Sequence, residues 1–309
     1  MRTWDQPPDG PFERSDLDRL RIPRQQLAEW LALGAVVHPV RGVYLAERCA
    51  GDTGARAAAL ARRLPPGAAV ARSTAAWLQG FDPRAPDQAD APLPLECVVP
   101  VGATPPRRPG VVARQSLLLP GDVVDVDGVP VTSPDRTALD LLRHLRPHMG
   151  LAVLDAMTAA SAAAPDALLE RLAGMPGQRS VARARRLVEL CEPASESYGE
   201  SWLRLRLVDA GFPRPEPQIW IHDRAGRGLY RLDLGWRERK VATEYDGVEF
   251  HGSPAARAAD LRRRDRLARE HGWTVVGVGR GEVLGHSLAL ELGVGHLLGI
   301  APTIRRRTW

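Results

Sequence analysis

Residues 229–251 read LYRLDLGWRERKVATEYDGVEFH, and this stretch decides how the last third of the chain is expected to fold. Polarity alternates along residues 230–236 and again along residues 241–246, which is the period-two pattern of β-strands. The charged residues 237–240 between them fit a hairpin loop. The pattern therefore predicts a simple antiparallel hairpin in which Trp236 pairs with Val241.

This register brings three acids together. Counting back from the turn places Asp233 opposite Glu244, and the Cβ atoms of directly opposed residues lie about 4.5–5.5 Å apart. Asp246 shares the face of Glu244, because strand side chains repeat every second residue. Carboxylates this close cost free energy unless a cation lies among them or one takes up a proton, and Mg²⁺ (or Mn²⁺) favours such oxygen ligands. The hairpin thus indicates a metal site, with solvent-facing strand acids as the alternative.

Composition limits the classes of protein that the chain can belong to. It has 309 residues, a net charge of +5 and a pI near 9.6, which favour an acidic partner such as nucleic acid. Lys240 is its only lysine. The three cysteines form no CxxC pair, so neither a disulfide framework nor a cysteine zinc site is indicated. With no signal-peptide pattern and no unbroken apolar span, we expect a soluble cytoplasmic protein.

The order of predicted elements around the hairpin gives an αβββαβα pattern. We expect a helix over residues 197–210, strands over 217–221, 229–236 and 241–246, a helix over 255–270, a strand over 273–278 and a helix over 281–298. Upstream, strands over 96–99, 111–115, 123–126 and 129–131 are followed by helices after Ser133 and over 152–162 and 165–172. The chain is therefore expected to be a mixed α/β multidomain protein divided at residues 1–50, 51–175 and 176–309.

The first 50 residues fit a winged helix-turn-helix. Ser15 is placed to cap a short helix, and Pro23 to open a second one. A small hairpin over residues 35–45 would then form the wing, with Arg41 in its turn. In this fold the second helix enters the major groove and the wing contacts the backbone, so Arg24, Gln25 and Arg41 are candidate DNA contacts. An ordinary helical packing unit is the alternative.

The first half also resembles the AbiEi family of type IV antitoxins. The similar motifs are Gly10-Pro11-Phe12, Asp16-Leu17, Arg41-Gly42-Val43-Tyr44, residues 72–80 (RSTAAWLQG) and residues 131–140 (VTSPDRTALD). The resemblance implies a DNA-binding regulator with a second small domain, and a toxin partner. A structural interpretation of Arg136 and Asp140 needs no chemistry, because the two residues can form an i,i+4 ion pair.

The last third resembles the restriction-endonuclease-like PD-(D/E)XK nucleases, in particular their DUF559 branch, which is related to very short patch repair endonucleases. The similar positions are residues 196–200 (ESYGE), Pro217-Gln218, residues 231–234 (RLDL), residues 244–247 (EYDG), His251, Arg264-Asp265 and residues 272–275 (GWTV). The resemblance implies a mixed sheet and a Mg²⁺ site held by Asp233 and Glu244, with Glu200 from the preceding helix completing it. Ser197 and Glu200 also form a capping box, which is an equal explanation of Glu200.

Two positions depart from the nuclease pattern. Asp246 stands where the wider superfamily has a lysine, and Gly277 stands where relatives usually have an arginine. His251 is the candidate for proton transfer in place of the lysine, with a loop histidine as the alternative. The arginines of the helix over 255–270, among them Arg263 and Arg264, would contact phosphate or neutralise neighbouring acids.

The sequence therefore predicts a metal-dependent DNA endonuclease guided by a winged-helix domain, in defence or repair. Its catalytic candidates are Asp233, Glu244, Asp246, His251 and Glu200. The alternative is an AbiEi-type DNA-binding repressor or antitoxin in which the nuclease fold is catalytically degenerate. DNA is the expected partner in both cases, with a toxin or a second copy of the chain as a further one.

Overall fold

The computed structural model describes residues 6–84, 91–247, 254–306 and 309. The chain folds into two compact units, Met1–His144 and Leu145–Trp309. The described residues form eleven α-helices and three β-sheets, so the expected mixed α/β class is confirmed. Within this part of the chain, no helix is both long enough and apolar enough to span a membrane.

The first unit begins with a three-stranded sheet in the order β1-β3-β2, formed by β1 (Phe12–Glu13), β2 (Val36–Val40) and β3 (Val43–Ala46), with α1 (Arg24–Ala32) between β1 and β2. Leu27 and Trp30 of α1 are buried in one cluster with Phe12 and Tyr44. The helix expected after Ser15 is shorter than predicted, a 3₁₀ turn at Arg14–Asp16. The Asp16 carboxylate accepts the Glu13 N–H at 2.9 Å, which closes this turn.

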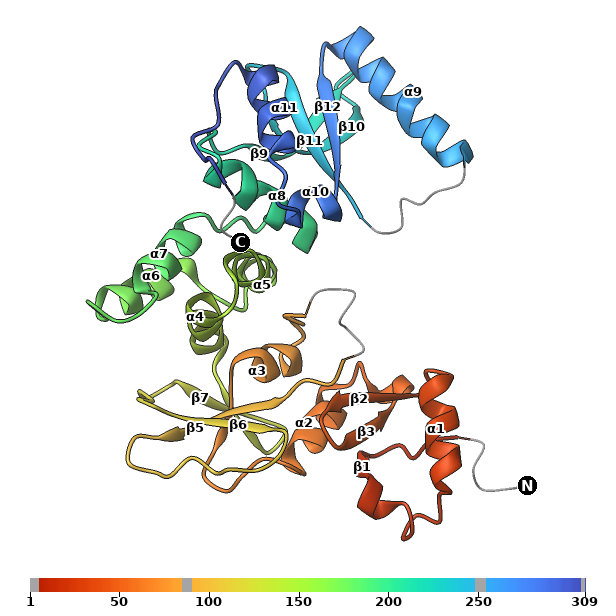
Figure 1. Cartoon of the computed structure of the whole chain (residues 1–309), viewed down its shortest axis with the longest axis vertical. Helices are drawn as coiled ribbons and strands as arrows, with labels where there is room; N and C mark the ends of the chain where they lie inside the picture. Colours follow the sequence, from red (N-terminus) through yellow and green to blue (C-terminus); the bar gives the residue numbers. More distant parts are fainter. Residues whose placement is uncertain (1–5, 85–90, 248–253, 307–308) are drawn as a thin grey trace. The chain divides into compact units, whose positions relative to one another are not determined.

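A five-stranded sheet in the order β6-β5-β4-β8-β7 fills the rest of the first unit. Its strands are β4 (Ala69–Val70), β5 (Leu95–Pro100), β6 (Val111–Ser116), β7 (Val123–Val126) and β8 (Val129–Thr132), and the accompanying helices are α2 (Thr53–Ala61), α3 (Arg72–Leu78) and α4 (Pro134–His144). Figure 1 shows α3 and α4 on one side of this sheet. The two-residue turn between β7 and β8 has positive φ at both Asp127 (50°) and Gly128 (79°), as a type I′ hairpin turn requires.

Buried polar contacts join α4 to the sheet. The predicted pair of Arg136 and Asp140 is present, with Nε and Oδ2 3.0 Å apart. Arg136 also donates to Asp122 at 2.6 Å, and all three residues are buried. The structural interpretation of this motif is therefore confirmed.

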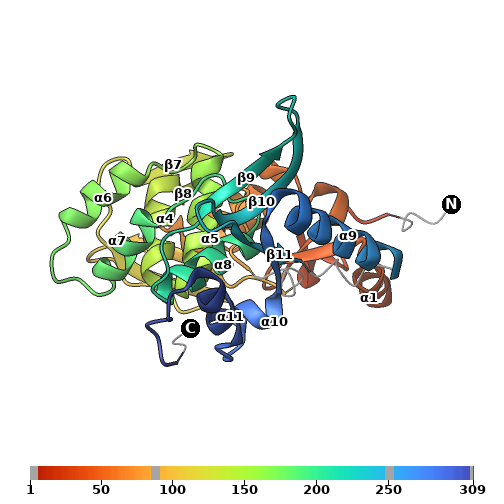
Figure 2. The same cartoon turned by 90° about the horizontal axis from the view of Figure 1, so that it is seen from above.

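The second unit begins with three helices and continues into the αβββαβ order expected from the sequence. The elements are α5 (Pro147–Ala159), α6 (Pro165–Ala173), α7 (Val181–Glu189), α8 (Tyr198–Asp209), β9 (Glu216–His222), β10 (Gly228–Trp236), β11 (Val241–Asp246), α9 (Pro254–His271), β12 (Thr274–Gly279), α10 (Arg280–Leu284) and α11 (Ala289–Leu298). The sheet is mixed, in the order β12-β11-β10-β9, with β11 and β12 parallel. In Figure 2 the β9–β10 hairpin extends beyond the rest of this sheet.

The register of the decisive hairpin is the predicted one, because Trp236 pairs with Val241 and Leu234 with Thr243. Apolar side chains hold the sheet against α9, with Leu267 of that helix buried beside Ile219, Leu232 and Ala242.

The prediction of a single helix over residues 281–298 is wrong, because this segment forms two helices, α10 and α11. The cause is Arg206 of α8, whose guanidinium is buried against the break. It donates to the carbonyl oxygens of Glu282, Val283, Gly285 and Ser287, which a continuous helix would have used internally. The buried Arg206 guanidinium thus supplies the hydrogen bonds that a further turn of helix would have given to these carbonyl oxygens.

Candidate functional site

An acid-lined pocket of about 540 Å³ lies where β10 and β11 face α9. Its lining residues are Arg231, Asp233, Glu244, Tyr245, Asp246, Ala259, Asp260 and Arg263. Three of the predicted catalytic residues, Asp233, Glu244 and Asp246, therefore border one pocket, together with Arg263. The hairpin register explains this proximity, because the pairing of Leu234 with Thr243 makes Asp233 and Glu244 the next positions along the two strands.

Asp233 is the most perturbed acid of the pocket. Its Oδ2 accepts the backbone N–H of Tyr245 at 3.0 Å. Burial, together with the neighbouring carboxylates of Glu200 and Glu244, raises the pKa of Asp233 to about 7, although the Tyr245 N–H and Arg263 act in the opposite direction. The three acids are therefore close enough to repel one another, as the sequence predicted for Asp233 and Glu244.

Glu244 is held by an arginine. Arg263 donates from Nη2 to Oε1 at 2.6 Å and from Nη1 to Oε2 at 2.8 Å, so both carboxylate oxygens are engaged. Arg263 Nη2 also donates to the carbonyl oxygen of Arg231 at 3.1 Å, which fixes the guanidinium across the pocket. The carboxylate raises the pKa of Arg263 in return.

Glu200 is buried at the start of α8, where local hydrogen bonds satisfy it. Its oxygens accept the Ser197 hydroxyl at 2.9 Å, the Glu196 N–H at 3.1 Å and the Gln218 side-chain amide at 2.9 Å. Its own N–H donates to Ser197 Oγ at 3.2 Å. Ser197 therefore caps α8 as predicted, but Glu200 accepts the Glu196 N–H in place of the Ser197 N–H that a full capping box would use. The Glu200 carboxylate also raises the pKa of Asp233.

Asp246 and Gly277 form a second acid–arginine arrangement. Arg264 lies 3.4 Å from Asp246 and 2.8 Å from Asp260, measured from Nη2 to the carboxylate oxygens. The pKa of Asp246 is raised by burial, and the charge of Arg264 offsets only part of this increase. A Cβ atom at Gly277 would overlap both the Arg264 guanidinium and the Asp246 carboxylate. The glycine at this position thus makes room for Arg264.

The fit of these acids to a metal ion can be tested on the geometry. Both Glu244 oxygens bind Arg263, and both Glu200 oxygens accept protein hydrogen bonds. Across residues 6–84, 91–247, 254–306 and 309, no three His, Cys, Asp or Glu side chains are grouped to hold a metal. The described acids therefore do not form a ready-made Mg²⁺ site. The predicted proton-transfer residue, His251, lies outside the described residues.

The predicted DNA contacts divide between the two units. Arg24 and Gln25 are exposed on α1, where the Gln25 amide donates to Glu29 at 3.1 Å, and Arg41 is exposed at the turn between β2 and β3. Arg263 and Arg264 instead hold the pocket acids. For these two arginines, neutralisation of acids is the role that the structure shows.

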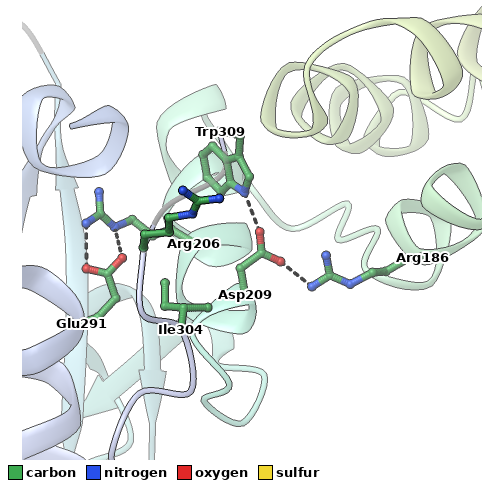
Figure 3. Close-up of a pocket in the computed structure, with 7 residues that line it drawn as sticks. Arg186, Arg206, Asp209, Glu291, Ile304 and Trp309 are labelled. Carbon is green, nitrogen blue, oxygen red and sulfur yellow. Dashed lines mark hydrogen bonds and ion pairs between the residues drawn. The ribbon is translucent and has the colours of Figure 1, made fainter. Parts of the chain in front are cut away.

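Sequence reasoning missed the buried arginines of α8. Arg206 pairs with Glu291 through Nε–Oε1 and Nη2–Oε2 bonds of 2.7 Å each, beside a cavity of about 260 Å³ that Asp209 and Trp309 also line (Figure 3). Arg204, also on α8, forms a buried ion pair with Asp155 of α5. The only sequence signal is the WLRLRL run, in which arginines alternate with apolar residues inside a predicted helix.

Fold and pocket together define a mixed α/β protein with an internally neutralised acidic pocket. The chain is 32% identical over 256 residues to the uncharacterized proteins MT2308 and Rv2248 of Mycobacterium tuberculosis, strains CDC 1551 / Oshkosh and ATCC 25618 / H37Rv. The match covers 82% of this chain and 89% of each relative, so the chain belongs to their family. Residues 68–190 match the AbiEi antitoxin C-terminal domain, which confirms the AbiEi part of the resemblance.

Proposed function

We propose that this protein is a DNA-binding regulator of the AbiEi antitoxin type, in which the C-terminal αβββαβ region is a nuclease-like scaffold. The observation that carries the proposal is the match of residues 68–190 to the AbiEi antitoxin C-terminal domain. A toxin encoded beside the protein is the expected partner.

The first unit supports the DNA-binding half of this proposal. Arg24 and Gln25 lie on the solvent side of α1, while Leu27 and Trp30 of the same helix are buried. A helix that exposes polar side chains next to a β-hairpin is the arrangement with which winged helices read the major groove.

The second unit supports the scaffold half. In a metal-dependent nuclease the strand acids must have free oxygens for the metal. The two hydrogen bonds from Arg263 occupy both oxygens of Glu244 instead. The acids therefore have a structural explanation that requires no hydrolysis.

Binding of the full-length protein to duplex DNA from the region upstream of its own coding sequence tests the regulator. We expect retardation of this DNA by the wild type and by Asp233→Asn, and loss of the sequence preference in the Arg24→Ala/Gln25→Ala double variant. An Arg237→Ala/Arg239→Ala variant, changed in the turn between β10 and β11, is the control for surface charge. Absence of binding by the wild type would refute the proposal, as would equal sequence preference in the Arg24/Gln25 variant.

The antitoxin half needs a separate experiment. Co-expression with the product of the neighbouring gene should relieve any growth arrest that this product causes. Continued arrest in the presence of folded antitoxin would leave a DNA-binding regulator without a toxin partner.

A Mg²⁺-dependent DNA endonuclease is the second candidate function, and one observation favours it. Glu200 and Glu244 approach Asp233 closely enough to raise its pKa, in a pocket of about 540 Å³ that is open to solvent. Supercoiled plasmid incubated with the wild type in Mg²⁺ or Mn²⁺, with EDTA and Asp233→Asn as controls, tests it. Nicking by the wild type alone would favour the enzyme, and equal outcomes in all samples would exclude it under these conditions.

A further inference from the structure

The wing of the first unit is joined to the sheet next to it. At the end of β2, Val40 forms a parallel bridge with Leu93, and the Arg41 N–H donates to the Leu93 carbonyl oxygen at 3.2 Å. Val40 and Val43 are buried in one apolar cluster with Leu95 and Val131 of the five-stranded sheet. The turn that carries Arg41 is therefore held in place by two sheets.

The loop between β5 and β6 lies against the same turn. Gly110 has a φ of +79°, and a Cβ atom built on it would lie 3.1 Å from Arg41 Cβ and 3.2 Å from Arg41 Cδ. The aliphatic part of Arg41 thus packs on Gly110, which follows Arg107, Arg108 and Pro109 in the chain. A larger residue at position 110 would have to displace Arg41.

Arg63 contacts both the loop and the wing turn. Its Nη2 donates to the Pro109 carbonyl oxygen at 3.1 Å. Its Cζ lies 3.7 Å from the position of a Cβ atom on Gly42. The wing turn and the loop are therefore fixed to each other before any ligand binds, which lowers the entropy cost of a joint contact.

The exposed charge at this place is positive. Arg41, Arg107 and Arg108 are exposed, and in the part of the chain that the structure describes their side chains have no ion-pair partner. The nearby acids, Glu13 and Asp16, already pair with other arginines. The pKa of His38, at the base of the wing, is lowered mainly by burial and further by the positive charges of Arg14 and Arg41.

We infer that the wing is composite: Arg41 from the β2–β3 turn and Arg107 and Arg108 from the β5–β6 loop contact phosphates of the same DNA duplex. This inference rests on the proposed function and extends it. The residue-68–190 region, which carries the antitoxin-domain match, then contributes directly to DNA binding through its β5–β6 loop. Such contacts position the protein on the duplex without reading sequence.

The salt dependence of binding tests the composite wing. Fluorescence anisotropy with a labelled duplex of mixed sequence, measured over a series of KCl concentrations, gives the slope of log Kobs against log[KCl]. The Arg107→Gln/Arg108→Gln double variant of the full chain should lower this slope by about two, because each phosphate contact contributes about 0.9. The Arg237→Ala/Arg239→Ala variant, with the same loss of charge in the second unit, should keep the wild-type slope.

Two glycine-to-alanine variants test the composite wing in the same binding assay without changing any charge. Gly110→Ala should weaken binding by displacing Arg41 and the loop. Gly102→Ala, in the same loop, has the same left-handed strain (φ +95°) but no atom within 4 Å of its Cβ position, and should bind as the wild type does.

The outcomes separate the inference from the function. Wild-type binding with an unchanged slope in Arg107→Gln/Arg108→Gln overturns the composite wing and leaves the regulator intact. No wild-type binding to any duplex overturns both. A changed interaction with the toxin partner, with DNA binding unchanged, would assign this surface to a protein and also overturn the inference.

Discussion

Arg263 binds both carboxylate oxygens of Glu244, through hydrogen bonds of 2.6 and 2.8 Å, at the place where the sequence predicts a metal ion. A guanidinium is permanently charged and matches the carboxylate geometrically, so it neutralises the acid without a metal. This relationship explains how neighbouring acids remain together in a half-buried pocket.

Removal of Arg263 should create a divalent-cation site. In Arg263→Gln the Glu244 oxygens are freed beside Asp233, and we expect Mn²⁺ binding that is stronger than in the wild type by isothermal titration calorimetry. Arg264→Gln, which leaves the Glu244 pair intact, is the control. Equal Mn²⁺ affinity in the wild type and in Arg263→Gln would contradict this prediction, because it would show that Arg263 does not keep the metal from Glu244.

Asp233→Asn should change the pH dependence of stability. The folded-state pKa is raised from 3.8 to about 7, so the folded protein keeps a proton that the unfolded chain loses. The free energy of unfolding therefore falls as the pH rises from about 4 to about 7. The asparagine variant lacks this loss, so its stability relative to the wild type should increase over this range in urea titrations.

Glu238→Gln, an exposed substitution in the turn after β10, removes one negative charge elsewhere and serves as the control. A stability difference between Asp233→Asn and the wild type that stays constant from pH 4 to pH 8 would show that Asp233 ionises normally.

Arg206→Met should be among the most destabilising single changes in the second unit. It leaves Glu291 buried without its partner, and removing one member of a buried ion pair typically costs about 3–5 kcal/mol. The Arg206→Met/Glu291→Leu double variant should recover part of this loss, because no unpaired charge remains. The carbonyl oxygens between α10 and α11 stay without Arg206, so recovery should be incomplete. Chemical denaturation of the four proteins gives the coupling energy, and additive losses would argue against a coupled pair.

Two helical glycines should respond to alanine in opposite directions. A Cβ atom at Gly199 in α8 would overlap the Tyr245 ring, so Gly199→Ala should destabilise the protein by about 1–3 kcal/mol or more. Gly293 in α11 has no atom within 4 Å of its Cβ position, so Gly293→Ala should stabilise by up to about 1 kcal/mol. Thermal melting measures both, and equal shifts would contradict the close packing of α8 on β11.

Local pattern predicted the elements and the central register. Alternating polarity located β10 and β11, and the short charged turn left one simple pairing, so Trp236 and Val241 were predicted partners and are observed ones. The Arg136–Asp140 pair was predictable for the same reason, since it depends on two residues four positions apart.

Local pattern could not predict contacts between distant segments. The break between α10 and α11 depends on Arg206, which is 76 or more residues earlier in the chain. The expected metal ligand Glu244 is held by Arg263, 19 residues away, and Gly277 accommodates Arg264 from α9 across the sheet.

The sequence by itself determined the hairpin and its acids, the αβββαβ order and the resemblance to AbiEi antitoxins, because periodicity, turns and motifs are local properties of the chain. Only the tertiary structure decided which cation neutralises the acids and which loop adjoins the wing. A carboxylate attracts a metal ion and a guanidinium by the same charge, and the choice between them depends on which groups packing brings within hydrogen-bonding distance. In this protein, packing brings Arg263 to Glu244.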